Sequence, residues 1–130
     1  MGLILDTNFV ITTEREARRG IFGRADRFLT DHSDESLFIT FTVAAELACG
    51  ESATPRKPWE RLCQRFPILP WSADVSWQYG QIYRTLAAEG KLIGANDLWI
   101  AATALANDMA VVTNNQSEFQ RVPGLEVITY

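Results

Sequence analysis

Short runs of apolar residues alternate along this chain with longer stretches in which apolar residues recur every three or four positions. The short runs cover residues 3–5, 37–40, 68–69, 110–113 and 125–128. Continuous apolar runs of this length, bounded by polar residues, are typical of strands buried inside a parallel sheet. The pattern therefore predicts five buried strands.

The longer stretches predict helices. These cover residues 8–19, a segment around 25–29, a helix capped by Thr42 and ending at Gly50, a short helix from Pro58 to before Pro67, residues 73–89 and residues 97–107. Serine, threonine and asparagine favour helix starts, and glycine favours helix ends. The helix over 73–89 has its apolar side at 3.6-residue spacing, made of Val75, Tyr79, Ile82, Tyr83 and Leu86. Loops are expected over 51–58 and 114–124.

Strands alternating with helices indicate a parallel sheet covered by helices on both faces. The chain has 130 residues, a common size for one domain with a complete core. We therefore expect a single domain over residues 1–130.

Composition narrows the class of protein. No apolar run approaches the roughly 18 residues of a membrane span, and the start lacks the charged and apolar regions of a signal peptide. We expect a cytoplasmic protein with no membrane contact, in which Cys49 and Cys63 are reduced thiols. The single histidine, His32, is expected to cap or decorate a loop.

Four acidic residues occur where the predicted strands end or the following helices begin. Asp6 ends the first strand, Glu46 lies early in the helix after the second, Asp97 opens the helix before the fourth strand, and Glu118 follows that strand. In a right-handed α/β sheet these positions gather at one edge, where ligands bind. The sequence therefore allows the four acids to line one cleft.

Each acid also has a simpler interpretation. Asp6 followed by Thr7 and Asn8 suits a helix cap, Glu46 and Asp97 suit the helix dipole, and Glu118 suits a solvated loop. Glu46 favours the cleft interpretation, because it lies among apolar residues where an isolated, buried carboxylate would be costly.

Carboxylates that converge repel one another, so they take up protons or hold a cation. Oxygen ligands suit Mg²⁺ or Mn²⁺, whereas a zinc site would need more histidine or cysteine than this chain offers. Divalent ions in an acidic cleft activate water and stabilise charge on a phosphoryl group. Metal-dependent hydrolysis of a phosphodiester is therefore the reaction class that the residues favour.

The net charge of −4 argues against nucleic-acid binding through the overall field of the protein. Positive charge is nevertheless concentrated in one stretch, residues 15–27, which carries +3. Its basic residues are Arg15, Arg18, Arg19, Arg24 and Arg27. They form either a solvated helical surface or a site for the phosphates of RNA.

Several segments resemble the PIN-domain family, and more closely the VapC toxins of VapBC-type toxin–antitoxin pairs. They are LILDTNFVI, the Glu46 of TVAAELACG, GANDLWIAATALAND and VVTNNQSEFQRVPGLEVITY. The last two are specific in combination, whereas LDTN alone is a weak motif. The region from 51 to 72 matches nothing specific.

The resemblance implies a three-layer α/β/α sandwich with a central parallel sheet, a homodimer, and Mg²⁺- or Mn²⁺-dependent cleavage of RNA such as tRNA or rRNA. It also implies a VapB-type antitoxin partner. It carries over the following site residues: Asp6, Glu46 and Asp97 as metal-site and catalytic acids, and Thr7, Asn8, Asn96 and Thr113 as their supports. At the fourth corner the family has an acid in one of two places, and here Asn115 holds the first and Glu118 the second.

Other interpretations remain. A non-catalytic PIN-like module acting as a DNA-bound regulator with its partner would keep the fold, although every acid of the presumed site is present. A receiver domain would need a further acid pair and a lysine after a late strand. A haloacid-type phosphatase would need an aspartate where Asn8 stands.

Overall fold

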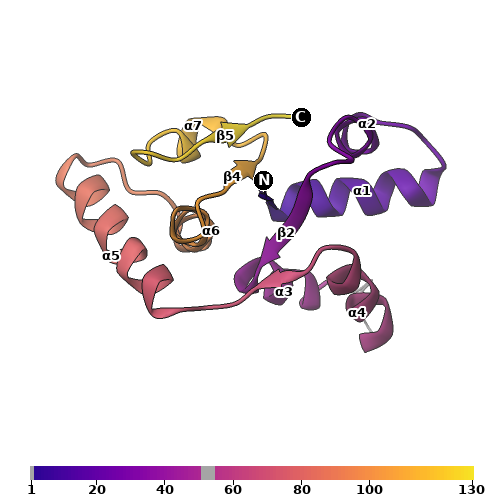
Figure 1. Cartoon of the computed structure of the whole chain (residues 1–130), viewed down its shortest axis with the longest axis horizontal. Helices are drawn as coiled ribbons and strands as arrows, with labels where there is room; N and C mark the ends of the chain where they lie inside the picture. Colours follow the sequence, from indigo (N-terminus) through magenta and orange to yellow (C-terminus); the bar gives the residue numbers. More distant parts are fainter. Residues whose placement is uncertain (1, 51–54) are drawn as a thin grey trace.

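The structure is a computed structural model that describes residues 2–50 and 55–130 (Figure 1). Its centre is a five-stranded sheet of order β3-β2-β1-β4-β5, in which every pairing is parallel. The strands are β1 (Gly2–Leu5), β2 (Ser36–Thr40), β3 (Ile68–Leu69), β4 (Ala110–Val112) and β5 (Val127–Ile128). All five overlap the apolar runs of the sequence, and β1 and β2 each begin one residue earlier, so the predicted strands are confirmed.

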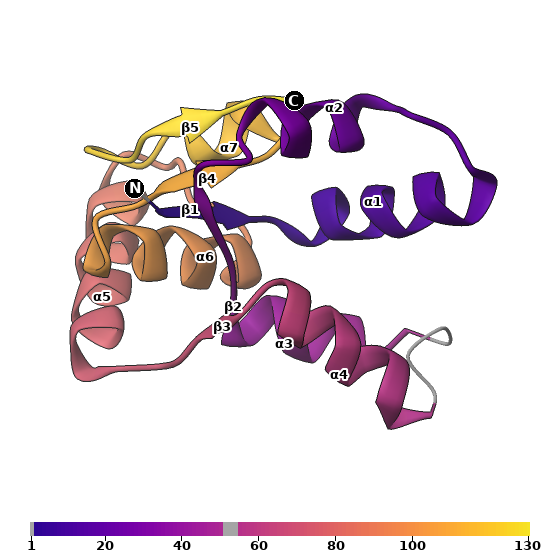
Figure 2. The same cartoon turned by 45° about the vertical axis from the view of Figure 1, so that its right-hand side comes forward.

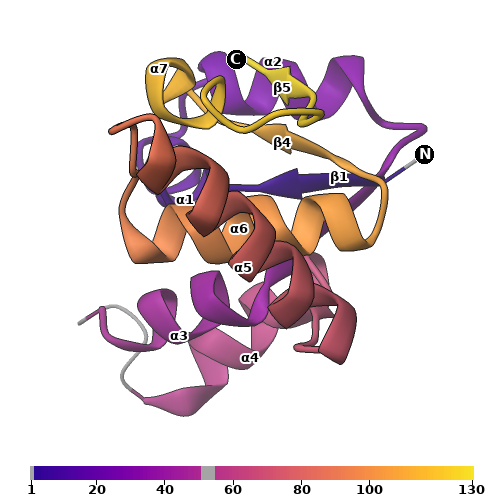
Figure 3. The same ribbon diagram turned by 90° about the vertical axis from the view of Figure 1, so that its left-hand side faces the viewer.

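Helices connect each strand to the next. They are α1 (Thr7–Arg19), α2 (Arg24–Asp31), α3 (Phe41–Ala48), α4 (Arg56–Arg65), α5 (Ala73–Ala88), α6 (Ala95–Ala106) and α7 (Gln116–Phe119). In Figure 1, α1 and α2 lie on one side of the sheet and α5 and α6 on the other. Turned by 90°, Figure 3 shows α5 and α6 in front of β1 and β4. The layers are those of the expected α/β/α sandwich.

The order in which strands are added to the sheet reverses between β1 and β4. From β1 the chain continues to β2 and β3 on one side, and then returns to β4 and β5 on the other. Ligands in open α/β sheets bind where the strand order reverses, outside the carboxyl ends of the strands. The relevant ends are those of β1 and β4, and Figure 2 shows β1 leading directly into α1.

The corner between α1 and α2 is held by a buried acid. Glu16 is 6% exposed, and its carboxylate accepts hydrogen bonds from the backbone N–H groups of Ala25 (3.2 Å) and Asp26 (2.9 Å). These N–H groups belong to the first turn of α2, where backbone N–H groups have no acceptor within the helix itself. Gly23 leaves room for this carboxylate, since a Cβ there would lie 2.2 Å from Glu16 Oε2 and would displace it.

Three expectations about local structure are wrong. Thr40, and not Thr42, caps α3, because its Oγ1 accepts from the Val43 N–H at 3.1 Å. The expected loop over 51–58 is shorter, since α4 begins at Arg56; residues 51–54 lie outside the described part. The segment after β4 is not all loop, because α7 forms there and buries Phe119.

The interior consists of the strands and the inward sides of the helices. The helix α6 contributes Leu98, Ile100, Ala101, Ala102 and Ala104, all buried, as its nearly continuous apolar sequence predicted. On α5 only part of the expected apolar side is buried, since Tyr83 is 47% exposed. Among the described residues, no helix has both the length and the apolar character needed to cross a membrane.

Candidate active site

Asp6 stands at the junction between β1 and α1. Its Oδ1 accepts a hydrogen bond of 2.8 Å from the Phe9 N–H, so the residue caps α1. The residue is largely buried, with 6% of its surface exposed, and it also lines a cavity. The two interpretations of Asp6, helix cap and site acid, are therefore compatible.

Thr113 holds the second oxygen of the same carboxylate. The register pairs Leu5 with Val112, the last residues of β1 and β4, so Asp6 and Thr113 lie side by side just beyond the two strand ends. The Thr113 hydroxyl, fully buried, donates to Asp6 Oδ2 at 2.5 Å. Burial raises the pKa of Asp6, while the hydrogen bonds from Thr113 and Phe9 oppose that rise. Together these contacts fix the direction of a carboxylate that burial alone would tend to neutralise.

Glu46 lies on α3 and contacts Asn96 on α6. The Asn96 side-chain amide donates a hydrogen bond to Glu46 Oε1, which joins two elements separated by 50 positions in the sequence. Glu46 itself is exposed. The argument that its apolar neighbours would bury it is therefore wrong: Ala45 and Ala48 are also exposed, whereas Ala44 and Leu47 are buried. Glu46 belongs to the solvent side of the site.

Asp97, in the first turn of α6, is the acid most affected by its surroundings. Burial raises its pKa to about 6, together with a hydrogen bond to Glu118 and the negative charges of Glu118, Asp6 and Glu46. Its Oδ2 also accepts from the Asn115 side-chain amide at 3.3 Å. Asp6, Glu46 and Asp97 line one cavity, and all three other acids contribute to the raised pKa of Asp97.

A cavity of about 180 Å³ lies between these side chains. It is lined by Asp6, Thr7, Asn8, Glu46, Asn96, Asp97, Ile100 and Asn115. Every predicted support except Thr113 thus lines the cavity, and Thr113 lies directly behind Asp6. Glu118 is not part of this lining and reaches the site through Asp97. Sequence reasoning missed Ile100, whose position one turn beyond Asp97 on α6 was the available signal.

The donor atoms of this cavity suit a hard divalent cation. They are carboxylate and amide oxygens, and the buried Thr7 hydroxyl has no hydrogen-bond partner in the described structure. No three Asp, Glu, His or Cys side chains of residues 2–50 and 55–130 are grouped closely enough to enclose an ion by themselves. Mg²⁺ commonly keeps several waters and takes one or two carboxylates from the protein, so the donor set fits a partly hydrated ion.

The five arginines of the basic stretch lie away from the cavity. Arg15, Arg18 and Arg19 follow on α1, and Arg24 and Arg27 on α2. All five are exposed. In the part of the chain that the structure describes, none pairs with a carboxylate, since the recorded ion pairs are Arg56–Glu60 and Lys91–Glu89. The arginines are therefore free to meet an anionic partner.

The remaining reactive residues lie elsewhere. Cys49 and Cys63 are free thiols, as expected. His32 ends α2 as its C-cap and accordingly takes no part in the acidic cavity.

Comparison with known proteins identifies the family. The PIN-domain family model matches residues 3–125. Ribonuclease VapC1 of Haemophilus influenzae (strain R2866) is 31% identical over 97% of this chain and 96% of its own length. Ribonuclease VapC2 of Rickettsia felis is 30% identical over 96% and 95%. The chain belongs to the VapC family of PIN-domain proteins.

Solved structures related to this VapC family member agree with its fold. VapBC-1 from nontypeable Haemophilus influenzae matches with a TM-score of 0.81 and 26% identity, over 99% of this chain and 98% of that one. VapBC2 from Rickettsia felis, bound to a DNA fragment from the promoter, matches with a TM-score of 0.82 and 26% identity, over 100% and 99%. The acidic cavity thus lies in a fold found in VapBC complexes.

Proposed function

We propose that this VapC family member is the toxin of a type II toxin–antitoxin pair and acts as a metal-dependent endoribonuclease. It hydrolyses phosphodiester bonds of RNA, with tRNA or rRNA as the substrate class, and thereby inhibits translation. The observation that carries the proposal is the acidic cavity at the carboxyl ends of β1 and β4, in a chain about 30% identical to proteins named ribonucleases.

The cavity residues divide into groups that would hold Mg²⁺ or Mn²⁺ and groups that orient them. Asp6, Asp97 and Glu46 supply carboxylates, with Glu118 as the fourth acid. When bound, the cation polarises water and neutralises charge on the phosphoryl oxygens. Asp97, whose pKa is raised to about 6, would still offer a charged carboxylate to the cation at neutral pH.

The supporting residues fix these carboxylates before substrate arrives. Thr113 holds Asp6, Asn96 holds Glu46, and Asn115 holds Asp97. Side chains that orient ligands through hydrogen bonds commonly contribute a factor of about 10–100 to metal affinity or activity. Thr7 and Asn8 offer further oxygens at the cavity wall.

Partners follow from the same family membership. We propose a VapB-type antitoxin, because the related H. influenzae and R. felis proteins were solved as VapBC complexes. We also propose that the exposed arginines of α1 and α2 contact the phosphates of RNA, since positive charge there is unpaired within a chain of net charge −4. The protein acts in the cytoplasm, where RNA is available.

The test is induction of the chain in bacteria without its antitoxin. Growth should stop, and mapping of RNA 5′ ends shortly after induction should reveal new cuts. Asp6→Ala and Asp97→Ala should remove both effects, while circular dichroism confirms that each variant is folded. If both variants are folded and still arrest growth, the nuclease proposal is excluded. Growth arrest without new RNA ends would favour the non-catalytic, DNA-bound alternative.

A further inference from the structure

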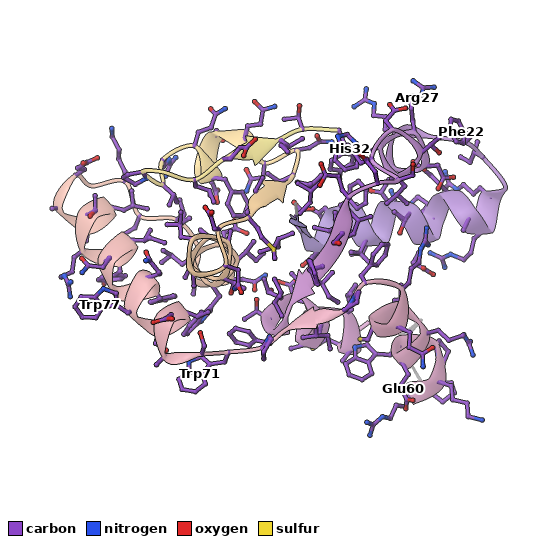
Figure 4. All side chains as sticks on the ribbon, in the orientation of Figure 1. Phe22, Arg27, His32, Glu60, Trp71 and Trp77 are labelled. Carbon is purple, nitrogen blue, oxygen red and sulfur yellow. The ribbon has the colours of Figure 1, made fainter. Side chains whose placement is uncertain are left out.

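A second cavity, of about 370 Å³, lies between α2 and the end of the chain that follows β5. Its size falls in the range of ligand pockets, about 300–1,000 Å³. It is lined by Arg24, Arg27, Phe28, Asp31, His32 and three C-terminal residues, including Tyr130. Figure 4 shows that Arg27 and His32 both project from α2, with His32 on the side facing the C-terminal segment.

The charge of this cavity favours an anionic ligand. Arg24 and Arg27 are exposed, and neither is paired with a carboxylate in the part of the structure that is described. Asp31 also lines the cavity, so its carboxylate offsets one of the two guanidinium groups. The lining side chains thus carry a net charge of +1 on a protein whose overall charge is −4, and arginine is well suited to phosphate.

An aromatic surface lies beside the two arginines. The His32 ring stacks on Phe28 with centroids 3.8 Å apart and planes 19° from parallel. Its Nδ1 is 2.9 Å from the Phe28 carbonyl oxygen, an acceptor only, so Nδ1 carries the hydrogen. No other described group bonds the ring, which leaves Nε2 available. The orientation of the His32 ring is therefore fixed, and its Nε2 is available to a ligand.

One residue, Tyr130, connects this cavity with the acidic one. It lines the second cavity, and its ring packs edge-to-face on the Phe9 ring with centroids 4.7 Å apart. The backbone N–H of Phe9 donates a hydrogen bond to the Asp6 carboxylate. The backbone N–H of Tyr130 donates to Asn114 Oδ1 at 3.2 Å, next to Asn115 of the acidic cavity. Contacts that run from Tyr130 through Phe9 to Asp6 therefore link the two cavities.

We propose that the second cavity binds one nucleotide of the single-stranded RNA whose neighbouring phosphodiester lies in the acidic cavity. Arg24 and Arg27 take the phosphate, and His32 takes the base by stacking and through Nε2. This inference rests on the proposed ribonuclease function. RNA is favoured over an acidic peptide, because guanidinium groups beside a flat ring match a phosphate beside a base, and because Tyr130 and Phe9 link this cavity to Asp6 of the acidic one.

The experiment measures binding of a labelled single-stranded RNA of about ten nucleotides by fluorescence anisotropy. All chains carry Asp97→Asn so that the RNA stays intact. Arg27→Glu should weaken binding and reduce the slope of log affinity against log salt by about 0.7, the value for one lost phosphate contact on a single strand. His32→Ala should weaken binding about fivefold or more, whereas His32→Phe, which keeps a ring, should retain the affinity.

Lys57→Glu is the matched control, since it makes the same change of charge at an exposed position on α4 and should bind like the parent. Thermal unfolding of each variant checks that α2 remains folded.

If the unsubstituted chain cleaves RNA but Arg27→Glu and His32→Ala bind normally, the subsite is wrong and the ribonuclease proposal stands. A loss from Arg27→Glu alone also overturns it, because general charge then suffices. Normal RNA binding with loss of antitoxin binding would make the cavity a protein-docking site. If the unsubstituted chain neither binds nor cleaves RNA, both proposals fail.

Discussion

The hydroxyl of Thr113 donates a 2.5 Å hydrogen bond to Asp6 Oδ2, across 107 positions of sequence. Both side chains are buried, so the bond is strong and little exposed to water. It also opposes the rise in the pKa of Asp6 that burial causes. The candidate site is thus held by a contact between the ends of two adjacent parallel strands.

Thr113→Val should remove this bond while keeping the shape of the side chain. The pKa of Asp6 should rise further, because the contact that stabilises the charged form is lost. RNA cleavage at neutral pH should fall by about 10–100-fold, and the ascending limb of its pH profile should move to higher pH. Thr113→Ser, which keeps the hydroxyl, should leave the limb in place. An unmoved limb in the valine variant would contradict this role.

Asp97→Asn should stabilise the metal-free protein above pH 6. The pKa of Asp97 is raised from 3.8 to about 6 in the folded protein. The folded protein therefore holds this proton more tightly than the unfolded chain does, and charging Asp97 destabilises the folded state. The cost is absent below about pH 4, grows as pH rises to about 6, and stays constant above. Thermal unfolding in EDTA should therefore show a melting temperature a few degrees higher for the variant at pH 7.5, and equal values at pH 3.5.

Either Glu118 or Asn115 completes the group of cation ligands around Asp6, Glu46 and Asp97. Asn115 lines the cavity, but it is neutral and its amide nitrogen already bonds Asp97. Glu118 lies outside the lining but helps to raise the pKa of Asp97, and it adds the negative charge that a second cation would need. Glu118→Gln should therefore lower Mn²⁺ affinity, measured by isothermal titration, and RNA cleavage more than Asn115→Ala does. The reverse order of losses would assign the corner to Asn115.

The outer side of α5 should form a homodimer contact. Trp77 is 61% exposed and Tyr83 is 47% exposed, and Figure 4 shows Trp77 directed away from the rest of the molecule. Tyr79 is different, since it packs against Trp99 with ring centroids 4.3 Å apart. Exposed aromatics are enriched at interfaces. Light scattering at micromolar concentration should give a dimer mass for the unsubstituted chain and a monomer mass for Trp77→Glu.

Phe22→Ser is the control for the dimer prediction, because Phe22 is 60% exposed but lies between α1 and α2, far from α5 (Figure 4). It should remain dimeric. A monomeric mass for the unsubstituted chain would make the exposed aromatics of α5 an unpartnered surface and refute the prediction.

The sequence alone determined the strands, most helices and the candidate acids. Apolar runs such as Leu3–Leu5 have one stable environment, the centre of a parallel sheet, so their burial follows from composition. Gly20 and Gly90 end α1 and the α5 segment at positive φ, as residues without a Cβ do most readily. The position of Asp6 directly after β1 then placed it at the ligand-binding edge.

Only the tertiary structure decided how these residues meet. The exposure of Glu46 and Tyr83 depends on which neighbouring elements cover α3 and α5, and no local pattern contains that information. Likewise, Glu16 is an acid within the basic stretch of the sequence, but it is buried against the first turn of α2. The contacts of Thr113 with Asp6 and of Asn96 with Glu46 join residues far apart in the chain. They arise from strand order and register, which are set by packing of the whole sheet, and packing is a property of all the residues together.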